Sequence, residues 1–128
     1  MSRFRTPLKN ARGLGSAKEG LHHWIIQRIT AVALVFLGCW FVYFVVGLVG
    51  SDRVAATEAI ARPWNAVLLI AFLISGFWHA QLGLQVVLED YVHSPLSAAV
   101  LQLAVRFACV LAALAGIFAV VLIALGRV

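Results

Sequence analysis

Three long stretches of the chain carry almost no charged side chains. Residues 29–50 and 63–88 contain no Asp, Glu, Lys or Arg, and residues 94–126 contain a single one, Arg106. A helix of about 20 apolar residues is long enough to cross a hydrocarbon layer roughly 30 Å thick. The polar–apolar alternation of a membrane β-barrel is absent from these stretches. The pattern predicts three transmembrane helices, at about residues 25–49, 65–90 and 96–125.

The residues at the helix limits agree with this pattern. Pro63 and Pro95 stand where the second and third helices would begin. Proline suits the first helical turn, because the N–H group that it lacks would have no partner there. Gly50, followed by polar residues, is typical of the end of a helix.

Composition excludes a water-soluble domain. Of the 128 residues, 63% are hydrophobic and 12% are charged, whereas soluble domains have roughly 45–50% and about 25%. A globule of this size would have too little polar surface to cover itself, and disordered chains are poor in apolar residues. We therefore expect an all-α integral membrane protein with a single domain.

The basic residues gather at the N-terminus. Residues 1–28 hold six Lys or Arg against one acidic residue, within a net charge of +5 for the chain. This predicts a basic N-terminal arm at residues 1–23 and a transmembrane domain at 24–128, with the N-terminus in the cytoplasm or mitochondrial matrix. A bacterial inner membrane is favoured over the mitochondrial one. No basic patch interleaved with aromatic residues exists, so a nucleic-acid partner is not expected.

His79 is the first candidate for chemistry, because an ionisable side chain deep in a bilayer suggests a function. It lies eleven residues before Asp90, which is about 16 Å along a helix. One interpretation is a packing histidine bonded to a neighbouring helix. The other is a metal ligand, in particular an axial ligand of haem iron.

Small residues accompany His79 on one side of its helix. Ser75 and Gly83 are four residues away on either side, and Gly76 is three residues before it. A flat macrocycle needs small residues around its ligand, but a close helix–helix contact would use them equally well. A haem with two axial ligands would take the second one from another subunit.

A polar cluster is predicted at the cytoplasmic end. The first helix opens with His22, His23 and Arg28, and the second closes with Asp90, Tyr91 and His93. A phenol, a carboxylate, an arginine and histidines at the membrane edge could bind a polar headgroup and relay protons to it. Ordinary interfacial anchoring is the alternative.

Two segments resemble a known family. They are HHWIIQRITA at residues 22–31 and the more specific HAQLGLQVVLEDYVH at residues 79–93. Both are similar to the smaller hydrophobic membrane anchor subunits of succinate dehydrogenase, respiratory complex II. The resemblance extends from His22 to the end of the third helix.

The resemblance implies a set of partners and cofactors. This chain would pair with a second anchor subunit, the cytochrome b anchor, in a two-subunit helical bundle, with haem b between them. The iron–sulfur subunit and the flavoprotein subunit would carry the iron–sulfur clusters and FAD. Electrons from succinate would reduce ubiquinone near the cytoplasmic face, and this chain would be inert alone.

The resemblance also implies roles for individual residues. His79 would be the haem ligand, and His22 and Arg28 would lie near the haem propionates. Tyr91 would bind the quinone, with Asp90 beside it. At His23 some relatives have an acidic residue. The small residues predicted to pack against the haem are Ser75, Gly76 and Gly83.

Two other classes of function stay open. A haem-free structural or assembly protein would use His79 only for packing. A small transporter subunit would line a path with His79 and Arg106, and it would need more broken helices and more polar residues facing that path than the sequence contains.

Overall fold

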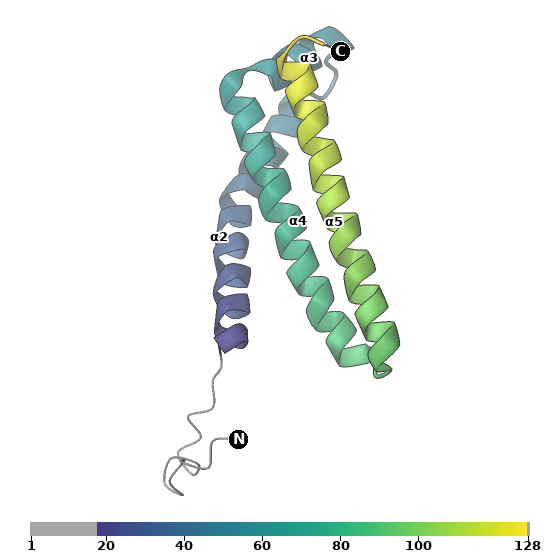
Figure 1. Ribbon diagram of the computed structural model, residues 1–128. Helices are drawn as coiled ribbons and strands as arrows, with labels where there is room; N and C mark the ends of the chain where they lie inside the picture. The colour runs from purple at the N-terminus through teal and green to yellow at the C-terminus, as the bar shows by residue number, and fades with distance from the viewer. Residues whose placement is uncertain (1–17, 128) are drawn as a thin grey trace, which may run out of the picture.

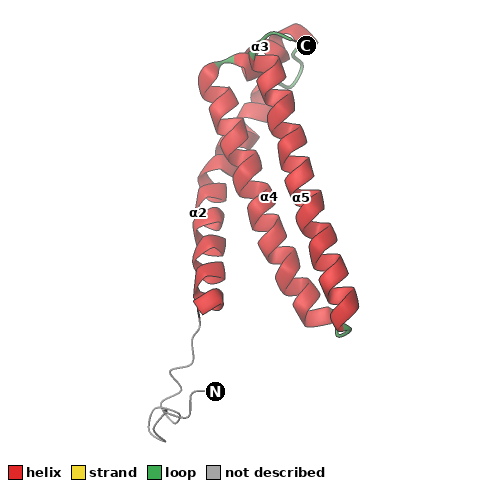
Figure 2. Cartoon of the chain, in the orientation of Figure 1, coloured by secondary structure: helices red, strands yellow, loops and turns green. Residues whose placement is uncertain are grey.

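A computed structural model describes residues 18–127, which form four helices joined by short connections (Figure 2). Three of them are long and apolar enough to cross a membrane, which confirms the predicted all-α membrane fold. Residues 1–17 of the predicted arm lie outside the described residues, and residues 18–23 are helical. The helices are α2 (Lys18–Gly47), α3 (Arg53–Ala61), α4 (Pro63–Tyr91) and α5 (Pro95–Ala124).

Helix α4 is the central element of the bundle. It packs against α5 on one side and against α2 on the other, and within residues 18–127 α2 and α5 do not approach each other closely. The start of α2 and the turn between α4 and α5 lie at one end, and α3 and the C-terminus lie at the other (Figure 1). This places the beginning of the first span on the same side as the turn after Tyr91, as three crossings require.

The best-packed region lies toward the α3 end. Ala66, Leu69 and Val120 form a small buried cluster. Nearby, the rings of Phe41 and Phe72 stack with their centroids 4.5 Å apart. Most other large apolar side chains are exposed, and none of the most hydrophobic window of α2 is buried. These exposed faces must therefore contact lipid or other chains.

Helix α3 was not among the predicted helices. Asp52 caps its start, because its Oδ1 accepts a hydrogen bond of 2.8 Å from the backbone N–H of Ala55. Just before it, Gly50 has φ 80°, a left-handed conformation that glycine adopts without steric cost. The turn after α2 thus leads directly into the short helix α3.

Gly116 permits the close approach of α5 to α4. A Cβ atom at this position would lie 3.0 Å from Leu73 Cδ1 and 3.2 Å from Leu73 Cδ2. We expect Gly116→Val to destabilise the bundle by about 1–3 kcal/mol, the usual cost of overpacking. Thermal unfolding of the purified complex would measure this. Adding Leu73→Ala should recover part of the loss, and strictly additive effects of the two substitutions would contradict the contact.

Candidate functional site

His79 lies near the middle of α4 and faces α2 with both ring nitrogens. Its Nδ1 is 3.0 Å from Thr30 Oγ1, and its Nε2 is 3.4 Å from Gln27 Nε2. The ring is half-buried. The contact with a neighbouring helix that the sequence suggested is therefore present, and it is made by two polar side chains one turn apart on α2.

The two glycines near His79 also face α2. A Cβ atom at Gly76 would lie 3.9 Å from Leu34 Cδ2, and one at Gly83 would lie 3.8 Å from Gln27 Nε2. Both are ordinary van der Waals distances. Ser75 is half-buried one turn before His79. The small residues thus accompany a close contact between helices, and their role in packing against a haem stays a prediction.

A groove that contains several polar side chains lies between the first turns of α2 and the last part of α4. It has a volume of about 370 Å³ and is lined by His23, Trp24, Gln27, Arg28 and Val86. The Arg28 guanidinium lies 4.6 Å from the centroid of the Trp24 ring, within the range of a cation–π contact. The groove therefore holds a positive charge close to the N-terminal end of α2.

Two polar atoms near this groove are buried without a hydrogen-bond partner, His23 Nε2 and Gln27 Oε1. Buried polar atoms in folded proteins normally have partners, so these two suit a polar ligand or partner group. The imidazole nitrogen of His23, when protonated, and the Arg28 guanidinium can donate to an anionic group, whereas Gln27 Oε1 can only accept from a donor. His22, which the family resemblance placed with Arg28, is exposed and does not line the groove.

Asp90 and Tyr91 are exposed at the end of α4, and the Tyr91 side chain is 78% accessible. Neither lines the groove that contains Arg28, and the lower ends of α2 and α4 diverge in Figure 1. Glu89, next to them, accepts hydrogen bonds from Gln85 and Gln102, which ties this end of α4 to α5. The predicted polar cluster is therefore not closed within this chain.

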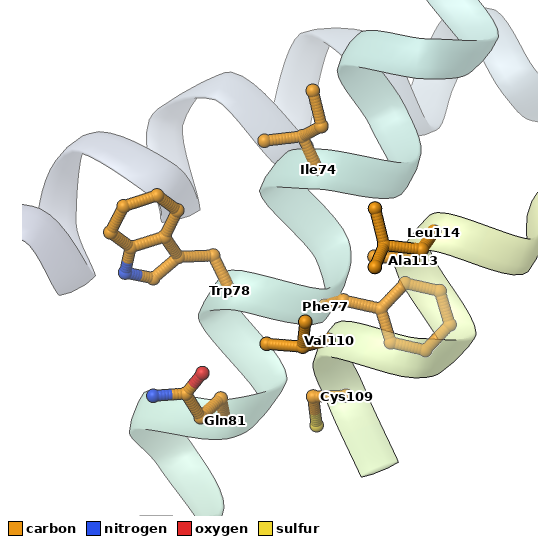
Figure 3. Close-up of a pocket in the computed structure, with 8 residues that line it drawn as sticks. All are labelled: Ile74, Phe77, Trp78, Gln81, Cys109, Val110, Ala113 and Leu114. Carbon is orange, nitrogen blue, oxygen red and sulfur yellow. The ribbon is translucent and has the colours of Figure 1, made fainter. Parts of the chain in front are cut away.

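A second groove, of about 150 Å³, lies between α4 and α5. Figure 3 shows its lining side chains, which are mostly apolar. His79 is not among them. This groove is therefore separate from the histidine site, and it resembles a surface for lipid or another apolar helix. Its lining residues are Ile74, Phe77, Trp78, Gln81, Cys109, Val110, Ala113 and Leu114.

Between residues 18 and 127 there is no group of three His, Cys, Asp or Glu side chains that could hold a metal ion. A metal near His79 would need ligands from outside this chain. His79 can supply one nitrogen ligand, so it fits a cofactor that is shared with a second protein chain.

Comparison with known proteins now identifies the family. The sequence model of the family described as succinate dehydrogenase/fumarate reductase transmembrane subunit matches residues 2–125 of this chain. The chain belongs to this family. It is a membrane anchor subunit of the succinate dehydrogenase complex, and other subunits of that complex are its partners. This confirms the family that the two sequence segments indicated.

Relatives cover nearly the whole length of this anchor subunit. A succinate dehydrogenase hydrophobic membrane anchor subunit of Rickettsia bellii (strain RML369-C) is 39% identical over 117 residues, 91% of this chain and 94% of the relative. One of Paracoccus denitrificans is 32% identical over 127 residues, 98% and 97% of the two chains. No solved structure matches significantly. The anchor subunit is thus a multi-pass membrane protein with bacterial homologues.

Neither Thr30 nor Gln27 was among the residues singled out in the sequence. Both lie in the segment at residues 22–31 that indicated the family, and they are spaced three apart on one face of α2. A polar pair at this spacing, inside an apolar helix, was the available signal. Its partner on α4 could be identified only from the packing of the two helices.

Proposed function

We propose that this anchor subunit supplies one axial ligand, His79, to a haem b held between it and the second anchor subunit. We further propose that Tyr91 forms part of a ubiquinone site, so that electrons from succinate reduce the quinone at the membrane. The iron–sulfur subunit and the flavoprotein subunit carry the clusters and FAD. The residues of this chain bind and orient the haem and the quinone.

The observation that carries the haem proposal is the placement of His79. It is a half-buried imidazole near the middle of a membrane-spanning helix, and its Nδ1 is held by Thr30 while its Nε2 has only a long contact of 3.4 Å. A haem-ligating histidine needs one nitrogen fixed by an outer partner and the other available to the metal. When bound, the haem supplies a one-electron redox centre.

The groove near Arg28 suits the polar edge of the same cofactor. The guanidinium is a donor of several hydrogen bonds, and His23 Nε2, buried beside it without a partner, can donate one more when it is protonated. Arg28 would bind a propionate as a charge-assisted pair. His22 would serve the same edge from the exposed face of the first turn of the membrane span.

Tyr91 would donate a hydrogen bond from its phenol to one quinone carbonyl, which stabilises the negative charge that develops there on reduction. The carboxylate of Asp90, next to it, would accept and return protons at the membrane edge. Because both side chains are exposed in this chain, the remaining walls of the site come from other subunits.

The orientation in the membrane follows from the same proposal. The N-terminus and the Tyr91 end of α4 would lie on the cytoplasmic side of a bacterial inner membrane, where the soluble subunits bind. The six basic residues among residues 1–28 favour this orientation. The continuous course of α4 and α5 argues against a transporter, which uses interrupted helices at its binding site.

A reduced-minus-oxidised visible spectrum of the complex, purified through this chain in mild detergent, tests the proposal. Succinate is added first and dithionite second. A b-type haem signal together with succinate–quinone reductase activity is expected. Activity without haem would overturn the ligand role of His79 and leave a haem-free anchor. Haem without quinone reduction would overturn the quinone site.

A further inference from the structure

Thr30 makes three polar contacts at once. Its Oγ1 lies 2.9 Å from the backbone carbonyl oxygen of Ile26, 3.1 Å from that of Gln27, and 3.0 Å from His79 Nδ1. A hydroxyl has one hydrogen to donate and two lone pairs that can accept. The two carbonyl oxygens can only accept, so the hydroxyl hydrogen goes to the backbone of α2, as is usual for threonine inside a helix. The oxygen then accepts a hydrogen from Nδ1.

The contact on the other side of the ring points to the same protonation. The amide nitrogen of Gln27 can only donate, and it faces His79 Nε2 at 3.4 Å. In this orientation of the amide, Nε2 faces it with a lone pair, which places the hydrogen of the neutral ring on Nδ1. The opposite tautomer would require the Gln27 amide to be reversed and the Thr30 hydroxyl to leave both backbone carbonyls.

We propose that Thr30 is a positioning residue for the haem site: it fixes the tautomer and the orientation of His79, so that the Nε2 lone pair is directed to iron. This rests on the proposed role of His79 as a haem ligand. Gln27 holds the lone pair through a long contact, and its own Oε1 is buried without a partner. The amide is therefore weakly held and yields Nε2 when the haem binds.

The test compares Thr30→Val, which has the same shape but no hydroxyl, with Thr30→Ser, which keeps it, in the whole purified complex. The readouts are haem per flavin, the haem midpoint potential and the low-spin electron paramagnetic resonance signal. We expect Thr30→Val to weaken haem binding about 10- to 100-fold, as is typical when an outer partner of a ligand is lost. The haem that remains should have a higher midpoint potential, because the imidazole becomes a poorer electron donor. Thr30→Ser should retain wild-type values.

Thr57→Val is the matched control. Thr57 on α3 is half-buried and also donates to backbone carbonyls of its own helix, at 3.0 and 2.9 Å, and its hydroxyl has no contact with a histidine. It should change none of the readouts. Haem that is unchanged in amount, potential and signal in Thr30→Val would overturn the positioning role and leave the ligand role of His79 intact. Wild-type complex without haem would overturn the ligand role itself.

A further variant, Thr30→Ala, tests the proposal if the complex does not assemble with Thr30→Val. Thr30→Ala only removes atoms and creates no new contact. A complex that assembles with this variant but shows the shifted potential supports the proposal. Failure of both Thr30→Val and Thr30→Ala to assemble, with Thr57→Val and Thr30→Ser intact, would show that the hydroxyl serves folding and would overturn the proposal.

Discussion

His79→Ala is expected to remove the low-spin haem signal from the purified complex, which is the largest spectroscopic effect predicted for this chain. Alanine has no nitrogen to offer, and nothing else near the middle of α4 could replace the ligand. The haem would then be absent or would keep only the ligand of the partner subunit, and either state lacks the low-spin signature. The reduced-minus-oxidised spectrum and electron paramagnetic resonance measure this directly.

Loss of the haem signal in His79→Ala could also arise from weaker packing between α2 and α4, so the size of that packing effect matters. If His79 only packed against α2, its removal would cost the contact with Thr30. Hydrogen bonds between membrane helices contribute about 0.6 kcal/mol on average, which is too little to disrupt a complex. A full loss of the signal in a complex that still assembles with all its subunits therefore cannot come from weaker packing. His93→Ala, at an exposed site just after α4, is the control, and a normal signal in His79→Ala would show that the iron has other ligands.

The three membrane-spanning helices could be predicted from the sequence because their limits depend on local properties. A stretch without charges must be long enough to cross the bilayer, and Pro63 and Pro95 mark the first turn of α4 and α5. Helix α3 was not predicted, because a search for long stretches without charges cannot find it. Its stretch contains charges of both signs, so it gives no hydrophobic signal. Asp52 followed by several good helix formers was the signal that could have located it.

The candidate site was only partly predictable. His79 could be found because the free-energy cost of an ionisable side chain in a bilayer depends only on its depth along one helix. Thr30 and Gln27 could not be assigned to it, because their contact depends on how α2 rotates against α4. The rotation of α2 also decides which of two adjacent histidines reaches the groove. Adjacent residues differ by about 100° around a helix, and His23 lines the groove whereas His22 does not.

The distribution of exposed groups indicates where this chain meets its partners. Few side chains are fully buried, and the polar groups proposed to act on haem and quinone are half-buried or exposed. Their sites are incomplete in one chain. This arrangement agrees with the proposal that the anchor subunit shares its cofactors with other subunits, since each partner would reach the same ligand from another side.

Tyr91→Phe is expected to slow quinone reduction by the complex on the order of 10²-fold, the usual cost of losing one donor to a developing negative charge. The change removes only the phenol oxygen, so the shape of the site is kept. The turnover number with ubiquinone should fall, because the lost hydrogen bond strengthens as the quinone is reduced. Oxidation of succinate with a soluble artificial acceptor should stay unchanged, since it bypasses the quinone site.

Tyr43→Phe is a matched control for this prediction. Tyr43 is 80% exposed and Tyr91 is 78% exposed. Tyr43, however, lies in the last turns of α2, near the opposite end of the bundle. Because a quinone that accepts electrons near the cytoplasmic face does not reach that end, Tyr43→Phe should retain full activity. Equal losses in both variants would indicate a general effect on assembly. Full quinone reduction by Tyr91→Phe would place the donor on another subunit, and the exposed end of α4 would then serve only for docking.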